Sequence, residues 1–130
     1  MKSELNSYLK DAISNFNIKN FDESKKLIMK VLSIQPRNFD ALLFMGVVLG
    51  AETKHEEAIK YFEKAIIINP KNVSINFNLA NALLNSNKPN ESLKYHIIAH
   101  NINPRDTNII INYGKCLIKL NKLDEAINIL

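Results

Sequence analysis

The chain has 130 residues, of which 46% are hydrophobic and 23% are charged. These proportions are ordinary for a soluble globular protein, and they exclude a disordered chain. Only three glycines and four prolines are present, too few for the many tight turns of an all-β fold, so the composition favours helices.

The net charge of +4 is a modest excess of lysine, since Arg37 and Arg105 are the only arginines. Proteins that read nucleic acids usually rely on clustered arginines, which make paired hydrogen bonds to bases and phosphates. We therefore expect no nucleic-acid partner.

Cysteine content and hydropathy bear on the location of the chain. A single cysteine, Cys116, has no partner for an intramolecular disulfide, which fits a reducing compartment. The N-terminal residues MKSELNSYLK lack the apolar core of a secretory signal, and the longest apolar run, 41–51, is too short to span a bilayer. These features predict a cytoplasmic protein without a membrane partner.

Prolines mark a regular period along the chain. Pro36, Pro70 and Pro104 are 34 residues apart, and the same step relates one column of glutamates and two columns of small residues. The columns are Glu23, Glu57, Glu91 and Glu125; Ser24, Ala58, Ser92 and Ala126; and Ala12, Gly46, Ala80 and Gly114. So many matches at one spacing indicate tandem repeats, in which the small residues let two helices approach closely.

Each repeat predicts two helices. The second helix ends before its proline, because the residue preceding a proline is pushed out of the α region. Two residues after each proline, Asn38, Asn72 and Asp106 are favourable N-caps for the next helix. The expected helices, in chain order, are 4–17, 21–34, 38–51, 55–68, 72–85, 89–102 and 106–119, with an eighth beginning near 123. Short connections make neighbouring helices antiparallel.

These repeats resemble tetratricopeptide repeats over essentially the whole chain. The second repeat carries LLFMGVVLG and HEEAIKYFEKAIIINP, the third LANALL and NESLKY, and the fourth YGKCL and LDEAI. The resemblance implies an all-α fold, a right-handed α-solenoid of tandem antiparallel hairpins whose first helices line a concave groove. We predict a single domain over 1–130, with repeats near 5–38, 39–72, 73–106 and 107–130, the last of them truncated.

The two ends of the repeat array differ. In the first repeat, Asp11, Asn15 and Lys25 occupy columns that are apolar in later repeats, which suits the polar outer side of a solenoid end. The far end leaves an apolar set that no following element buries, Leu123, Ile127 and Leu130. We interpret this end as a boundary within a longer protein, and we expect self-association through the uncapped face.

No constellation of residues is typical of catalysis or of a metal site. His96 and His100 have a spacing that can bind zinc from one helix face, but the metalloprotease motif needs a glutamate where Ile97 follows. His96 stands in the column of Ile28 and Phe62, so we interpret it as a core or interface histidine. We predict that this chain is not an enzyme and that it binds no metal and no cofactor.

The first helices are expected to present a mixed surface to the groove, apolar and amide-rich with few charges. The residues predicted to bind a peptide there are Leu43, Phe44, Val47, Phe77, Asn78, Asn81, Asn85, Ile111, Asn112 and Lys115. Amide side chains donate and accept hydrogen bonds along a peptide backbone, while aromatic and aliphatic side chains supply contact area. Asn78 and Asn112, which are 34 residues apart, resemble two rungs of the asparagine ladder in O-GlcNAc transferases.

Some tetratricopeptide domains clamp the acidic tails of chaperones with lysine and asparagine pairs. The first pair of clamp positions, which needs a lysine and an asparagine, holds Leu9 and Ile13 in this chain. In the next register the same positions hold Leu43 and Val47, so this type of clamp is absent.

We predict a scaffold that binds a protein or peptide partner in the groove. The alternative is an N-terminal, substrate-recruiting arm of a larger enzyme, such as a bacterial glycosyltransferase or sulfotransferase. The abrupt end of the sequence and the pair of groove asparagines are the reasons for considering this alternative.

Overall fold

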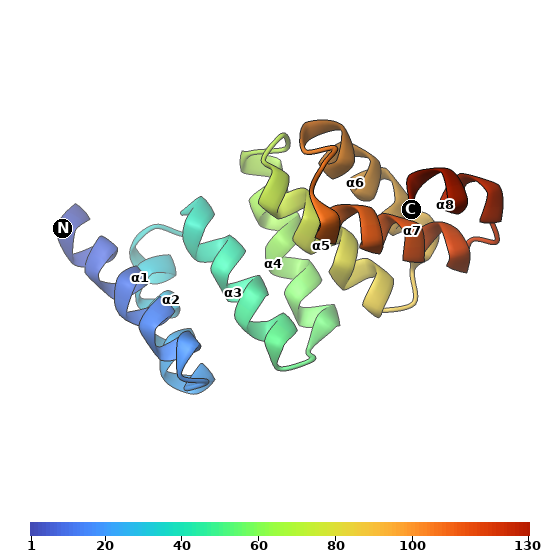
Figure 1. Ribbon diagram of the computed structural model, residues 1–130. Helices are drawn as coiled ribbons and strands as arrows, with labels where there is room; N and C mark the ends of the chain where they lie inside the picture. Colours follow the sequence, from blue (N-terminus) through green and yellow to red (C-terminus); the bar gives the residue numbers. More distant parts are fainter. The chain divides into compact units, whose positions relative to one another are not determined.

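The computed structural model describes all 130 residues, which form eight α-helices and no strand (Figure 1). The helices are α1 (Lys2–Asn17), α2 (Phe21–Ile34), α3 (Phe39–Ala51), α4 (His55–Ile68), α5 (Val73–Asn85), α6 (Pro89–Ile102), α7 (Thr107–Lys119) and α8 (Leu123–Ile129). Every predicted helix is found, with ends that differ by at most two residues. The all-α prediction is confirmed.

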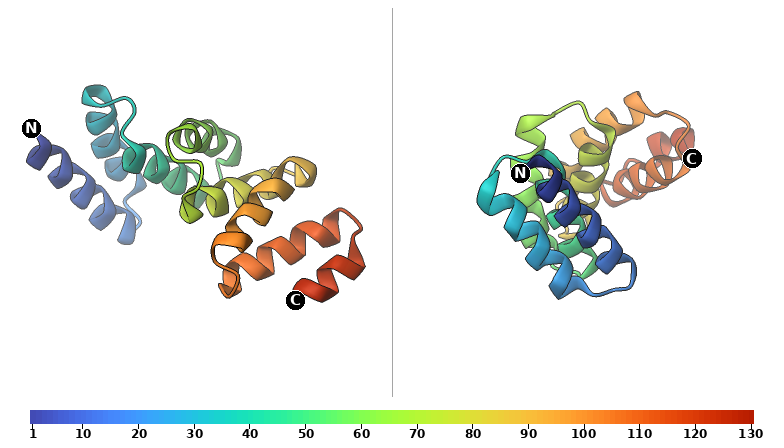
Figure 2. Two further views of the ribbon diagram at one scale, coloured as in Figure 1. Left: turned by 90° about the horizontal axis from the view of Figure 1, so that it is seen from above. Right: turned by 90° about the vertical axis from the view of Figure 1, so that its left-hand side faces the viewer.

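The helices form two compact units. The first unit, Met1–Ile68, contains α1 to α4, and the second unit, Asn69–Leu130, contains α5 to α8. Within each unit consecutive helices pack as antiparallel hairpins, α1 with α2, α3 with α4, α5 with α6, and α7 with α8 (Figure 2). The single domain predicted for 1–130 and its repeat boundaries stay predictions.

Side chains cap the first helix of three hairpins, at the three positions that the sequence predicts. The side-chain oxygen of Asn38 accepts a hydrogen bond from the Ala41 amide at 2.9 Å, and Asn72 accepts one from Ile75 at 3.1 Å. Asp106 accepts two, as described below. Each cap satisfies backbone amides that have no partner within the helix, which fixes where α3, α5 and α7 begin.

Small residues occupy the contact between the two helices of every hairpin. All eight members of the two small columns are buried. In the first hairpin the Ser24 hydroxyl donates to the Ala12 carbonyl at 2.8 Å, so the helix backbones lie close together. In the second hairpin a side-chain carbon at Gly46 would collide with the ring of Phe62. The predicted role of the small residues is therefore confirmed.

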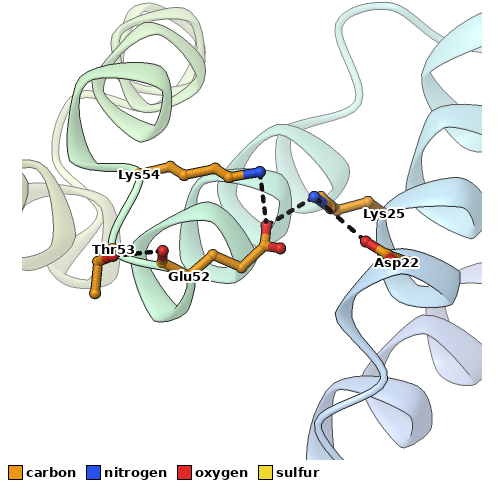
Figure 3. A network of polar contacts seen from close by, with 5 residues as sticks. All are labelled: Asp22, Lys25, Glu52, Thr53 and Lys54. Carbon is orange, nitrogen blue, oxygen red and sulfur yellow. Dashed lines mark hydrogen bonds and ion pairs between the residues drawn. The ribbon is translucent and has the colours of Figure 1, made fainter.

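Lys25 differs from its predicted place at the outer end of the array. Its ammonium lies 2.7 Å from Glu52, beside the second hairpin, in a network that also includes Lys54 and Asp22 (Figure 3). The hydrogen bond with Glu52 raises the pKa of Lys25. The interpretation as part of the polar outer side is wrong for Lys25, because α2 packs against α3 and turns this residue towards the C-terminal end of α3.

The second unit contains a buried amide among apolar neighbours in the sequence. The Asn76 side chain is fully buried, and its Nδ2 donates to the carbonyls of Pro70 at 2.9 Å and of Asn72 at 2.8 Å. These bonds attach the 70–72 turn to α5. In the same unit α6 packs on α7, and α5 lies beside α7.

Two further observations concern the surface. None of the eight helices combines the length and the apolar character that crossing a membrane requires. On α8 the predicted apolar set is exposed, with Leu123 at 55%, Ile127 at 73% and Leu130 at 65%, although the Leu130 side chain also lies against Gly114.

The turn inside each hairpin contains one residue with a positive φ. These residues are Lys19, Thr53, Asn87 and Asn121, with φ between 61° and 63°. The following amide bonds back into the helix, as from Lys54 to the Leu49 carbonyl at 2.9 Å. Such a helix end usually employs glycine, since a side chain is strained in the left-handed region, and a β-branched residue is strained most.

We therefore predict that Thr53→Gly stabilises the chain by about 1 kcal/mol, because glycine removes the strain at positive φ. Asn87→Gly should change stability less, since asparagine tolerates this conformation. Urea unfolding measures both, with Thr53→Ala as a control that keeps the strain. A loss of stability in Thr53→Gly would contradict the proposed backbone strain at Thr53.

Two glycines of α3 give a matched test of hairpin packing. Gly46→Ala should destabilise the chain by about 1–3 kcal/mol, because the added methyl displaces Phe62 from the core. Gly50 has no atom within 4 Å of the position of an added methyl, so Gly50→Ala should stabilise the helix by up to about 1 kcal/mol. Urea unfolding should therefore show changes in stability of opposite sign for the two variants. Equal changes would refute close packing at Gly46.

Candidate inner-surface binding site

The second unit has a pocket beside α5 and α7. Its volume is about 130 Å³, and α5, the turn before α7 and the start of α7 line it. Its residues are Val73, Ser74, Phe77, Asn78, Asn103, Asp106, Asn108 and Ile109. Two of the predicted peptide-binding residues, Phe77 and Asn78, are thus brought together with turn residues that the prediction did not include.

Asp106 connects the pocket to the cap of α7. One of its carboxylate oxygens accepts from the amides of Asn108 at 2.9 Å and Ile109 at 3.2 Å. The other oxygen makes no hydrogen bond within the chain. Asp106 therefore fixes the start of α7, and it also lines the pocket.

Amide side chains lie along α5 and α7. Nδ2 of Asn78 donates to the Ser74 carbonyl at 2.9 Å, and Nδ2 of Asn112 donates to the Asn108 carbonyl at 3.0 Å. Each amide is thereby held against its own helix, while its carbonyl oxygen makes no hydrogen bond. These two predicted residues are positioned as acceptors.

Asn81 is a further acceptor on α5. Its Oδ1 is buried and has no hydrogen-bond partner. An unpaired buried acceptor costs about 1–3 kcal/mol, so such a group is uncommon in a folded protein. We define the inner surface of the second unit as the exposed and half-buried side chains of one face of α5 and one face of α7. These are Ser74, Phe77, Asn78, Asn81, Asn85, Asn108, Ile111, Asn112 and Lys115.

Charges lie only near the ends of this inner surface. α5 has no ionisable side chain. On α7 the carboxylate of Asp106 stands at the N-terminal end, and the exposed Lys115 and Lys119 stand towards the C-terminal end. At 1.5 Å per helical residue, Asp106 and Lys119 are about 20 Å apart along the axis. The surface is thus neutral and amide-rich in its middle, with opposite charges at its two ends.

The remaining predicted site residues lie on α3 of the first unit. Leu43, Phe44 and Val47 are half-buried there. The Phe44 ring meets the Phe16 ring of α1 edge-on at 5.3 Å, so part of its surface is used within the unit. The role of these three residues in binding stays a prediction.

The other chemistry-bearing side chains are arranged for packing. Cys116 is buried, with Sγ at 3.4 Å from the Ser92 hydroxyl, and burial raises the pKa of its thiol. His96 is fully buried, which confirms its interpretation as a core histidine. No group of three or more His, Cys, Asp or Glu side chains is placed to hold a metal ion.

The fold and this surface define a class: a helical-repeat protein built from tandem antiparallel hairpins. Residues 51–130 match the protein family described as "Anaphase-promoting complex, cyclosome, subunit 3". The chain belongs to this family, whose repeats are of the tetratricopeptide type, and the resemblance inferred from the sequence is confirmed. No curated protein matches the chain.

Several solved structures share the fold. A MamA protein of Desulfovibrio magneticus RS-1 has a TM-score of 0.89 and 16% identity, over 98% of this chain and 72% of that chain. Another MamA structure has a TM-score of 0.91 and 18% identity, over 99% of this chain and 70% of that one. YrrB, described as a TPR protein with an unusual peptide-binding site, has a TM-score of 0.87 and 24% identity, over 94% of this chain and 63% of YrrB. At these identities the likeness concerns the fold alone.

Proposed function

We propose that this chain is a protein-interaction scaffold, and that it binds an extended peptide segment of its partner on the inner surface of the second unit. The observation that carries the proposal is the pocket on α5 and α7, which brings Phe77 and Asn78 beside amide side chains whose carbonyl oxygens make no hydrogen bond. A ligand with a row of N–H donors would satisfy such acceptors, and an extended peptide backbone is that ligand. YrrB, a fold relative whose description names a peptide-binding site, supports the same reading.

The pocket and the charges define the segment more closely. A volume of about 130 Å³ suits one medium-sized side chain, packed on the Phe77 ring. At the Asp106 end of the inner surface a basic residue of the bound segment would be favoured. At the Lys115 end an acidic residue would be favoured. Each exposed ion pair contributes only about 0.2–1 kcal/mol, so the charges orient the segment, while apolar contact and amide hydrogen bonds supply the affinity.

The test compares the wild type with Phe77→Ala/Asn78→Ala/Asn112→Ala in pull-downs from host extract, quantified by mass spectrometry. Loss of one apolar contact and two acceptors should reduce capture of the partner at least tenfold. The control on α6 is Ile97→Ala/Asn90→Ala/Asn101→Ala, which also removes one apolar and two asparagine side chains, from exposed positions. Circular dichroism verifies that both variants are folded.

A partner that is lost only in the inner-surface variant would support the proposal, and the partner's captured segment could then be titrated as a synthetic peptide. If both variants retain the same partners as the wild type, binding takes place elsewhere and the proposal fails.

The alternative role as the recruiting arm of a larger enzyme would employ the same inner surface, and it stays a prediction. The lack of enzyme activity and the cytoplasmic location also stay predictions.

Self-association is a separate prediction that rests on the exposed apolar side chains of α8. Burying Ile127, which is 73% exposed, against a second copy would be favourable by about 1–2 kcal/mol for each side chain. Light scattering over a concentration series should show a mass that rises with concentration, and Ile127→Lys should abolish the rise. A constant monomer mass would rule this contact out.

A further inference from the structure

His96 of α6 is a buried polar side chain without hydrogen bonds. Its exposed fraction is 0%, and neither ring nitrogen has a partner. The matching positions of the preceding second helices hold Ile28 and Phe62, which are buried and apolar. A neutral imidazole always carries one donor and one acceptor, so His96 loses hydrogen bonds to water that an aliphatic residue never makes.

Tyr113 of α7 is the ring that covers His96. The two rings are nearly parallel, with centroids 6.3 Å apart and an interplanar angle of 7°. One helical turn later His100 meets the same Tyr113 ring edge-on at 5.6 Å, and its Nδ1 is also buried without a partner. Two imidazoles of α6 and one phenol ring of α7 are therefore part of this helix contact.

No opposite charge faces His96. The helices packed against α6 are α5 and α7, and α5 has no ionisable side chain. On α7 Tyr113 and the buried Cys116 face α6, whereas Lys115 and Lys119 are exposed. The remaining titratable residues of α6 are the exposed Glu91 and Lys94, the half-buried Tyr95, and His100. Burial and the charge of Glu125 on α8 raise the pKa of Tyr113, so this phenol stays neutral.

An imidazolium at this position would be a buried, unpaired charge. Burial accordingly lowers the pKa of His96 from the ordinary 6.5 to about 4. Between these two values the unfolded chain binds a proton that the folded chain does not. The free energy of unfolding therefore has its full value above about pH 6.5, and it decreases as the pH falls from 6.5 towards about 4.

The two helices joined by this contact lead into the wall of the pocket. The turn that leads from α6 into α7 contributes Asn103 and Asp106 to the pocket, and the first turn of α7 contributes Asn108 and Ile109. We propose that protonation of His96 separates α6 from Tyr113 of α7 and opens the peptide site of the second unit, so that ligand binding weakens as the pH falls below 6.5. The ligand part of this inference rests on the proposed function, whereas the separation of the helices does not.

The test replaces His96 by the aliphatic residues of its column, as His96→Leu and, independently, His96→Ile. Between pH 6.5 and pH 5 the unfolding equilibrium constant of the wild type should rise about tenfold more than that of either variant in urea titrations. His55→Gln, in the first unit, serves as the control and should keep the pH dependence of the wild type. If one variant does not fold, the other gives the same comparison.

Hydrogen exchange followed by mass spectrometry locates the opening without any ligand. At pH 5 the segment 103–112 of the wild type should exchange at least fivefold faster than in His96→Leu at the same pH, while α1 and α3 exchange equally in both. Equal exchange of this segment, or an equal pH dependence of unfolding, would overturn the inference. Neither measurement involves a partner, so such a failure would leave the proposed binding function standing, and the pull-down decides that function separately.

Discussion

In each hairpin the two helices can come close only because small residues line the contact on both sides. The Ser24 hydroxyl bonds to the Ala12 carbonyl, and Gly46 leaves the space that the Phe62 ring fills. A larger side chain at either place would force the axes apart and expose the apolar residues around them. This constraint determines where the first helix of each hairpin lies against the second. The arrangement of α5 and α7 around the pocket therefore depends on it.

Within that regular scheme, Lys25, Asn76 and His96 are polar residues in columns that are otherwise apolar, and each is accommodated differently. Lys25 forms an ion pair with the carboxylate of Glu52, so its charge is compensated. Asn76 donates to two turn carbonyls, which fixes the start of α5. His96 has only ring contacts with Tyr113 and no hydrogen bond. The residue that is least well accommodated thus lies on α6, the helix that leads into the wall of the pocket.

Much of the fold could be predicted because it depends on local chemistry that recurs every 34 residues. Proline, the N-cap residues and the small columns determine where helices begin, end and touch. The positive φ in the hairpin turns was not predictable in this way, since Lys19 and Thr53 are not residue types that favour it. Likewise, the direction of Lys25 depends on how α2 meets α3, which periodicity within one helix does not reveal.

The site was predictable only in part. Helical spacing is sufficient to place Phe77 and Asn78 on the inner side of α5, and both line the pocket. The contribution of Asn103 and Asp106 arises from the turn between α6 and α7, where side-chain direction depends on tertiary packing. A signal was present in the sequence, since Asp106 is a predicted N-cap, but capping alone does not indicate that this residue lines a pocket.

The most direct test of the central claim is site-specific photo-crosslinking in the host cell. A photoreactive phenylalanine analogue is introduced at Phe77, on the inner surface, or at Ile97, which is 38% exposed on α6. Binding on the inner surface predicts a discrete crosslinked partner from position 77, mapped by mass spectrometry to one extended segment, and none of that species from position 97. The same crosslink from position 97 with none from position 77 would contradict binding on the inner surface.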